Sequence, residues 1–285
     1  IRFDDRITGK LNEFAPNAHI IHVDIDESEG SKNVPTKVFL NADVREVLNQ
    51  LPSTLTKKNR FYREEWIDHL NEKRNKFPLK KPDHKIFNMM TALDILNKYS
   101  NDDLIVATDV GQHQMWAGQY LRKMKPNHFL TSGGLGSMGF GLPAAMGAKA
   151  AQPTKTVWCI AGDGSFQMNL QEMITLVQEK WNVRILLLDN NYLGMVRQWQ
   201  EQFYDKNYSG VDMLNPDYVL LAEAYGIKCA SVDNANDYLK ALEEADKTDG
   251  PFLIHARVIK EDNVLPMVPP MASLNDTIYY TDLEK

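Results

Sequence analysis

Apolar runs that alternate with helical segments constrain the fold of this chain more than any other feature. Four stretches show them: "DLIVATDVG", "KTVWCIAGD", "VRILLLDN" and "PFLIHARV". Strands that are apolar nearly throughout are typical of parallel sheets whose two faces are both covered by helices. The sequence therefore predicts an α/β fold, a doubly wound parallel sheet with helices on both faces. We expect a short strand at 228–232 and helices at 86–99, 139–152, 170–180, 216–226 and 235–247.

The segment in front of this sheet is too short to bury a core of its own. Residues 18–26 have the pattern of a strand, and residues 38–51 that of a short strand followed by a helix. We therefore expect residues 1–51 to be the C-terminal part of a second α/β domain. Because the chain also lacks an initiator Met, we expect it to be a fragment of a longer protein.

Residues 52–84 have the composition of a linker. They are polar and rich in Lys, Arg and Glu, and they include aromatic residues such as Phe61 and Trp66. Acids interleave with the bases, which favours a solvated linker helix with a few apolar anchors over a nucleic-acid-binding patch. Residues 85–285 then form the sheet domain and its C-terminal tail.

Composition excludes some classes of partner. With 43% hydrophobic residues, 25% charged residues and a net charge of −6, nothing favours nucleic acid or an acidic membrane as a partner. No apolar stretch approaches the roughly 18 residues of a membrane span. Cys159 and Cys229 are far apart in sequence, which is typical of reduced thiols in a cytoplasmic protein rather than of a disulfide framework.

One glycine pattern suggests a dinucleotide site. "GLGSMG" contains Gly134, Gly136 and Gly139, precedes a predicted helix, and is followed about 20 residues later by Asp163. However, "HFLTSG" is a poor strand to lead into this loop, and the pattern leaves the glycines on both sides of Asp163 unexplained. A nicotinamide-dependent dehydrogenase therefore stays a minor alternative.

A metal site explains more of these residues. Ligands of parallel sheets bind beyond the carboxyl ends of the strands, where this chain has "AGDGS" and, after a crossover, "LDNNY". Asp163 and Asn190 would bring a carboxylate and an amide oxygen to one edge, and a backbone carbonyl could add a third ligand. Such oxygens, together with those of a diphosphate, suit Mg²⁺. Ordinary turn chemistry is the alternative for each position alone.

The same residues carry a family resemblance. "GDGS" followed by "DNN" resembles the signature of thiamine diphosphate enzymes. "GQHQMWAGQY", "SGGLGSMGFGLPAA", "LGMVRQWQEQFY" and the opening "IRFDDRITGKLNEFAPNAHIIHVDID" are similar to the catalytic subunit of acetolactate synthase. The resemblance covers nearly the whole chain and is weakest at 52–84 and in the last few residues.

The resemblance implies a set of cofactor contacts. The metal ligands would be Asp163, Asn190 and the backbone oxygen of Tyr192. Asp189 stands where the family usually has Asn, and the resemblance gives it no role. The other implied contacts of thiamine diphosphate are Gln112, His113, Gly136, Met138, Gly164, Ser165, Leu193, Gly194 and Met195. Met195 and Trp199 would line the substrate entrance.

The resemblance also implies what lies outside this site. The front segment would be the end of an FAD-binding central domain, although a stump of that domain is not expected to hold the flavin firmly. Its flavin contacts would be Asp5, Arg6, Asp24, Ile25, Asp43 and Val44. The Glu that activates thiamine diphosphate would belong to the N-terminal domain of a partner subunit. No catalytic residue is therefore assigned in this chain, and we expect it to be inactive alone.

The implied reaction is the decarboxylation of pyruvate and addition of the two-carbon unit to a second pyruvate or to 2-oxobutanoate, in branched-chain amino acid biosynthesis. The cofactors would be thiamine diphosphate, Mg²⁺ and FAD. The partners would be 2-oxo acids, further copies of the chain and a regulatory small subunit. Another thiamine-diphosphate-dependent carboligase or decarboxylase, or a non-catalytic module, remains an alternative.

Overall fold

The structure is a computed structural model that describes residues 3–54, 61–122 and 124–283. The chain divides into two compact units. One unit comprises Lys81–Val264, and the other comprises Ile1–Lys80 together with Leu265–Lys285. In the described part of the chain, no helix combines the length and the hydropathy needed to cross a membrane.

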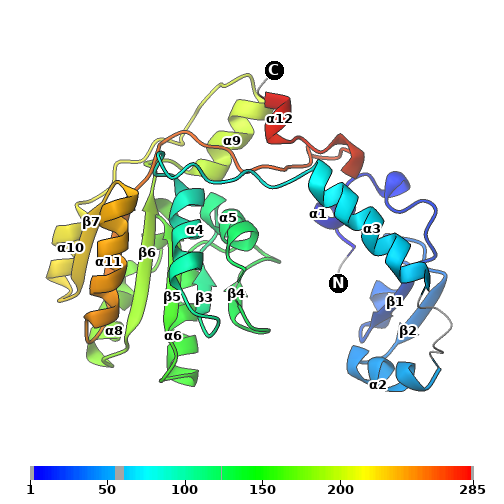
Figure 1. The fold of residues 1–285 in the computed structure, drawn as a ribbon, viewed down its shortest axis with the longest axis horizontal. Helices are drawn as coiled ribbons and strands as arrows, with labels where there is room; N and C mark the ends of the chain where they lie inside the picture. The colour runs from blue at the N-terminus through cyan, green and yellow to red at the C-terminus, as the bar shows by residue number, and fades with distance from the viewer. Residues whose placement is uncertain (1–2, 55–60, 123, 284–285) are drawn as a thin grey trace. The chain divides into compact units, whose positions relative to one another are not determined.

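The larger unit is built around a parallel sheet of six described strands (Figure 1). The strand order is β4-β3-β5-β6-β8-β7, and every neighbouring pair is parallel. The strands are β3 (Ile105–Thr108), β4 (Phe129–Thr131), β5 (Val157–Gly162), β6 (Val183–Asp189), β7 (Lys228–Val232) and β8 (Phe252–Arg257). The predicted parallel sheet is therefore confirmed.

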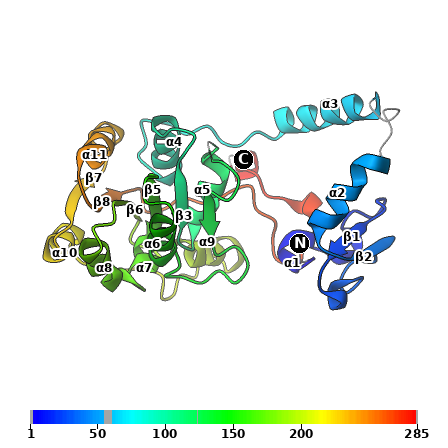
Figure 2. The ribbon, with the colours of Figure 1, turned by 90° about the horizontal axis from the view of Figure 1, so that it is seen from below.

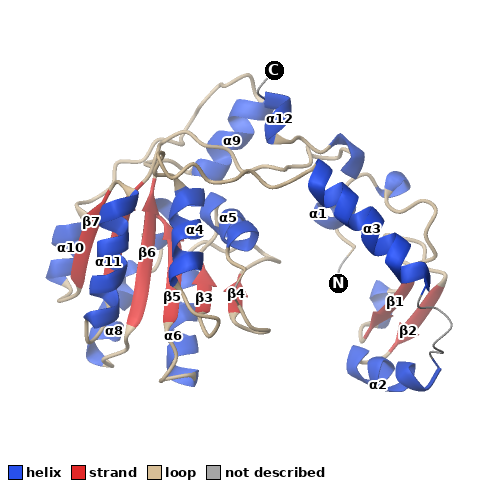
Figure 3. Cartoon of the chain, in the orientation of Figure 1, coloured by secondary structure: helices blue, strands red, loops and turns tan. Residues whose placement is uncertain are grey.

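Helices cover both faces of this sheet, as predicted. Figure 2 shows α4 and α11 on one side of the strands and α6, α8 and α10 on the other. The helices of this unit are α4 (Met89–Tyr99), α5 (Gln112–Tyr120), α6 (Gly141–Ala151), α7 (Asp163–Phe166), α8 (Met173–Gln178), α9 (Gly194–Phe203), α10 (Tyr218–Ala224) and α11 (Ala235–Lys247). Figure 3 shows how they alternate with the strands.

The central strand β5 illustrates why the apolar runs are nearly continuous. Val157, Cys159 and Ala161 belong to one core cluster with residues of α6, α8 and α10. Trp158 and Ile160 alternate with them and therefore face the other layer, where they are also buried. Both faces of β5 are buried, and a polar side chain on either face would lose its hydrogen bonds to water. The strand therefore has apolar residues up to its carboxyl end.

The winding of the chain places a crevice beyond β3 and β5. From β3 the chain goes to β4 on one side, and then crosses back to β5 on the other side of β3. The order of the strands thus reverses between β3 and β5. In doubly wound sheets this switch point is the usual place for a ligand.

The glycine-rich loop does not form a dinucleotide site. The strand that leads into it, β4, has three residues and lies at the edge of the sheet, and its one neighbour among the described strands is β3. The carboxylate of Asp109, at the end of β3, accepts hydrogen bonds from the backbone N–H groups of Gly139 and Gly141, both at 2.9 Å. Asp109 is 1% exposed, so a buried carboxylate occupies the start of α6, where a pyrophosphate would bind.

The smaller unit contains two parallel strands, β1 (Ile21–Asp24) and β2 (Val38–Asn41), followed by α2 (Val44–Thr54). The predicted strand and strand-then-helix are both present. The remaining helices are α1 (Asp5–Thr8), α3 (Phe61–Lys76) and α12 (Tyr280–Leu283). Trp66 in α3 is 60% exposed and stacks on His69. The side chain of Phe61 lies outside the described residues.

Candidate functional site

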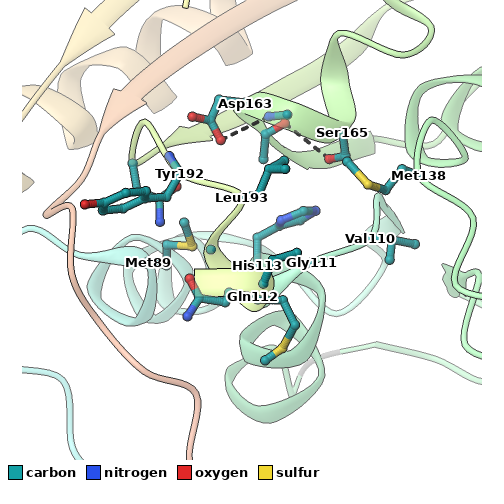
Figure 4. A pocket seen from close by; sticks show the side chains of 16 residues that line it. Met89, Val110, Gly111, Gln112, His113, Met138, Asp163, Ser165, Tyr192 and Leu193 are labelled. Atoms are coloured by element: carbon teal, nitrogen blue, oxygen red, sulfur yellow. Dashed lines mark hydrogen bonds between the residues drawn. The ribbon is translucent and has the colours of Figure 1, made fainter. Parts of the chain in front are cut away.

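A pocket lies at the carboxyl ends of β3, β5 and β6, at the switch point of the sheet (Figure 4). It is formed by the start of α5, the turn from β5 into α7, and the loop from β6 to α9. Its sixteen described lining residues are Met89, Val110, Gly111, Gln112, His113, Met138, Gly162, Asp163, Gly164, Ser165, Asn190, Tyr192, Leu193, Gly194, Met195 and Val196.

The pocket brings together nearly all the sequence-predicted contacts. Every residue predicted to contact thiamine diphosphate or Mg²⁺ lines it, except Gly136. Trp199, predicted at the substrate entrance, lies outside the described lining; it is 40% exposed and packs edge-on against Phe203. Sequence reasoning did not assign Gly111 and Gly162 to the lining. It also missed the apolar Met89, Val110 and Val196, because an apolar residue beside a pocket has no distinct pattern.

The glycines around Asp163 allow close approach of side chains from other segments. A Cβ atom on Gly162 would lie 2.8 Å from Nδ1 of His113, and one on Gly164 would lie 2.7 Å from Cδ2 of Leu193. Larger residues at either position would push the α5 start or the β6–α9 loop away from Asp163. The two glycines therefore draw the three segments of the pocket together.

The predicted metal ligands are held by local hydrogen bonds. Oδ1 of Asp163 accepts from the backbone N–H of Gly164 at 3.0 Å (Figure 4), and Oδ2 accepts from Asn215 Nδ2 at 2.8 Å. Oδ1 of Asn190 accepts from the backbone N–H of Tyr192 at 3.3 Å. Tyr192 also forms an antiparallel bridge with Asp212, which fixes the loop that carries its carbonyl group.

Asp189, to which the sequence assigned no role, does not line the pocket but forms hydrogen bonds with residues around it. It is buried, and its Oδ2 lies 2.8 Å from Nε2 of His255 on β8. Its Oδ1 accepts from the backbone N–H of Asn191 at 3.0 Å and from Asn215 Nδ2 at 2.8 Å. Asp189 therefore ties the tip of β6 to β8 and to the chain around Asn215.

The two carboxylates have opposite pKa shifts. Burial, and after it the neighbouring Asp189 carboxylate, raise the pKa of Asp163 to about 7 against the lowering effect of the Asn215 hydrogen bond. Burial acts in the same direction on Asp189, but hydrogen bonds from His255 and the Asn191 backbone outweigh it and lower the pKa of Asp189. Two adjacent buried carboxylates cannot both carry a charge without cost, and a cation would remove that conflict.

The opposite side of the pocket is suited to an anion. α5 and α9 both begin there, so their first N–H groups and helix dipoles favour negative charge. Figure 4 shows Gln112 and His113 at the start of α5. Among the described residues, neither Oε1 of Gln112 nor Nε2 of His113 has a hydrogen-bond partner, although both side chains are buried. Such orphaned polar atoms fit a site that a polar ligand completes.

His113 is uncharged near neutral pH in this structure. Burial lowers the pKa of its imidazole to about 4, although the charge and backbone of Asp109 oppose that shift. A bound diphosphate would raise this pKa again, because it would bring negative charge to the ring. The donors, oxygens and charges of the pocket together fit a hydrated divalent cation and a diphosphate.

The predicted flavin contacts lie in the smaller unit. Asp24 ends β1 and Ile25 follows it, whereas Asp43 precedes α2 and Val44 begins it. Both pairs therefore lie at the carboxyl ends of neighbouring parallel strands. Ile25 and Val44 are exposed. Asp5 and Arg6 belong to α1, and Asp5 lines a separate pocket near Lys10.

The fold and the pocket define a class of enzyme, and comparison with protein families identifies it. Residues 109–256 match the model described as "Thiamine pyrophosphate enzyme, C-terminal TPP binding domain", and residues 1–51 match that of the central domain of the same enzymes. The chain belongs to the thiamine pyrophosphate (thiamine diphosphate) enzymes.

Within this class the chain is similar to acetolactate synthases. It is 43% identical over 280 residues to the acetolactate synthase isozyme 2 large subunit of Escherichia coli (strain K12), covering 97% of this chain and 50% of that protein. It is 43% identical over 274 residues to the acetolactate synthase large subunit of Porphyra purpurea, covering 94% of this chain and 46% of that protein. It is 41% identical over 293 residues to the chloroplastic acetolactate synthase 1 of Nicotiana tabacum, covering 98% and 44%.

These comparisons confirm the resemblance found in the sequence. The chain spans about half the length of the curated relatives it matches, so the resemblance covers only that part of each relative.

Proposed function

We propose that this chain supplies the metal- and diphosphate-binding side of an acetolactate synthase site. The observation that carries the proposal is the pocket at the switch point, where Asp163 and Asn190 meet the starts of α5 and α9. Oxygen ligands on one side and N–H donors on the other suit Mg²⁺ and a diphosphate, respectively.

Each side chain has a role in this proposal. Asp163, Asn190 and the carbonyl oxygen of Tyr192 would hold Mg²⁺. The first N–H groups of α5 and α9 would bind the diphosphate, with Ser165 beside them and His113 as a donor when protonated. Thiamine diphosphate, when bound, would supply an electron sink for breaking the bond next to a 2-oxo group.

The apolar wall would orient the rest of the cofactor and the substrates. Met138 and Met195 line the pocket and would exclude water from the reacting end. Trp199, partly exposed beside Phe203, would present a flat surface to the second 2-oxo acid, and such contacts discriminate alkyl groups by about 1–3 kcal/mol. The substrates would be pyruvate and then pyruvate or 2-oxobutanoate.

The proposal extends to the assembly. A second copy of the full-length protein would bring the activating Glu, so this chain alone would not form acetolactate. FAD would bind at the carboxyl ends of β1 and β2 in the full-length enzyme. Since two of the relatives cited are named large subunits, a small regulatory subunit is a further proposed partner.

Calorimetric titration of the purified chain with thiamine diphosphate, with and without Mg²⁺ and with NAD as comparator, tests the proposal. Binding should require Mg²⁺ and disappear in Asp163→Ala, because the variant lacks the one carboxylate among the proposed ligands. Asp237→Ala, an exposed site on α11, is the matched control and should bind normally. Binding of NAD alone, or acetolactate formation by the isolated chain above background, would contradict the corresponding part of the proposal.

A further inference from the structure

The loop between α9 and α10 carries an asparagine that the site described so far does not explain. Asn215 Nδ2 donates to Oδ2 of Asp163 and to Oδ1 of Asp189, both at 2.8 Å. Its Oδ1 accepts from Nε2 of Gln167 at 3.1 Å. Asn215 is therefore bonded to the tips of two neighbouring strands at once, because Asp163 follows β5 and Asp189 ends β6.

The chemistry of the partners fixes the orientation of this amide. A carboxylate oxygen that carries no proton can only accept hydrogen bonds, so the NH₂ group faces Oδ2 of Asp163 and Oδ1 of Asp189, and the amide oxygen faces Gln167. Both N–H bonds of the NH₂ group are then used, one on each carboxylate. A neutral donor of this kind holds two buried carboxylates together without adding a charge that would compete with a cation.

The chain just before Asn215 also holds the loop that carries Tyr192, whose carbonyl oxygen is the third proposed metal ligand. Residues 211–215, hereafter the 211–215 segment, run antiparallel to residues 191–193. The backbone N–H of Leu193 donates to the carbonyl oxygen of Val211 at 2.9 Å, and that of Met213 donates to the carbonyl oxygen of Asn191 at 3.0 Å. The two bonds flank Tyr192, whose carbonyl group is the proposed ligand.

Gln167, the residue that directly follows α7, supports this arrangement. Its Nε2 donates to Oδ1 of Asn215 and to the carbonyl oxygen of Asp163, at 3.1 and 3.2 Å. The hydroxyl of Tyr218 donates to that same carbonyl oxygen at 3.4 Å. The side chain and the backbone of Asp163 are thus fixed by residues that follow it by 4 to 55 positions in the sequence.

We propose that Asn215 is a positioning residue of the cation site, which orients the Asp163 carboxylate by bridging it to Asp189 while the 211–215 segment holds the Tyr192 carbonyl. The inference rests on the proposed function, since it concerns the same Mg²⁺ site. Partners of this kind orient metal ligands, and their loss typically weakens metal binding about 10- to 100-fold.

The test uses Mn²⁺ as a spectroscopic substitute for Mg²⁺. Mn²⁺ binding to the 285-residue chain is followed by electron paramagnetic resonance in the presence of thiamine diphosphate. Asn215→Ala should weaken Mn²⁺ binding about 10- to 100-fold. Gln167→Leu should weaken it less, and the double variant should show less than the sum of the two effects, because the two residues share a hydrogen bond.

Asn234→Ala is the matched structural control. Asn234 caps α11 by accepting from the backbone N–H of Asp237 at 2.9 Å, so its loss should lower thermal stability as removal of a helix cap does. It lies outside the pocket lining and should leave Mn²⁺ affinity unchanged. If Asn215→Ala lowers only the melting temperature, as this control does, Asn215 is merely structural and the inference is wrong.

A second measurement separates failure of this inference from failure of the proposed function. The side-chain NH₂ protons of Asn215, assigned by their loss in Asn215→Ala, should exchange slowly with solvent in the ligand-free protein. Slow exchange in a wild-type chain that binds no Mn²⁺ would overturn the proposed function and leave the bridge itself intact. Rapid exchange, or unchanged Mn²⁺ affinity in Asn215→Ala, would overturn the positioning role while the proposed function stands.

Discussion

The pKa values of His113 and Asp163 are shifted for the same physical reason. Burial disfavours the ionised form of each, which lowers the pKa of His113 to about 4 and raises that of Asp163 to about 7. Near neutral pH the ligand-free pocket therefore has an uncharged His113 and an Asp163 close to the midpoint of its titration. A cation and a diphosphate bring opposite charges that compensate each other, and they would restore the charged forms of both side chains.

The shift of His113 makes a prediction about stability and pH. A folded-state pKa of about 4 lies below the unfolded value of 6.5, so the unfolded chain binds more protons between these values. Stability should therefore fall as the pH is lowered from 6.5 toward 4, and this loss should be smaller in His113→Gln. Thermal unfolding of both proteins across this pH range provides the measurement.

The comparison between the two proteins isolates the histidine. The raised pKa of Asp163 acts in the opposite sense, because that carboxyl group holds a proton more firmly in the folded chain than in the unfolded one. This contribution is common to wild type and variant and cancels in the difference. Parallel curves of melting temperature against pH would refute the assigned shift of His113.

At the scale of elements, α6 depends on a carboxylate from another strand. Asp109 accepts from two backbone N–H groups around the start of this helix. A buried N–H group left without an acceptor costs about 1–3 kcal/mol. Asp109→Ala should therefore lower the free energy of unfolding by more than about 2 kcal/mol, measured by urea denaturation.

Asp217→Ala is the control for that prediction. Asp217 caps α10 by accepting from the N–H groups of Val219 and Leu220, but this cap is exposed to water. Water replaces a lost exposed cap, so the expected loss is about 1 kcal/mol. If both variants lost the same free energy of unfolding, burial of the Asp109 hydrogen bonds would not add to their contribution to stability.

The apolar runs predicted β3, β5, β6 and β8, but β4, α5, α7 and α9, which all lie near the site, escaped prediction. β4 has only three residues and a single neighbour, too few for a pattern. α5 begins directly after Gly111 and consists largely of Gln, Trp and other residues without a clear apolar stripe; it forms because it packs against α4 and the sheet. Tertiary contacts of this kind leave no local trace in a sequence.

The candidate site shows the same limit. Asp163 and Asn190 could be paired because they end strands that a crossover joins directly. Asn215 could not be found in this way, because it belongs to a loop that is distant from both residues in the sequence, although it contacts Asp163 in the structure. His255 reaches Asp189 only because β8 inserts next to β6, although β7 comes between them in the sequence.

At the scale of the whole molecule, the two units differ in how much of their sheet is buried. All residues of β5 and β6 are buried, whereas those of β2 are exposed or half-buried. Hydrogen exchange measured by mass spectrometry should therefore show much slower exchange in β5 and β6 than in β1 and β2, because strands with little burial open more often. Comparable protection in both sheets would contradict this expectation.

The all-parallel sheet has a consequence for the order of events during folding. No neighbouring pair in it can form as a hairpin, so each pairing must first close a long loop at a cost in chain entropy. Such topologies fold slowly. The pocket draws on the ends of three strands, so it comes into existence only when the middle of the sheet is complete. A cation that needs the complete pocket would therefore bind only after the sheet has folded. It would stabilise the folded protein by mass action, but it would not help to nucleate folding.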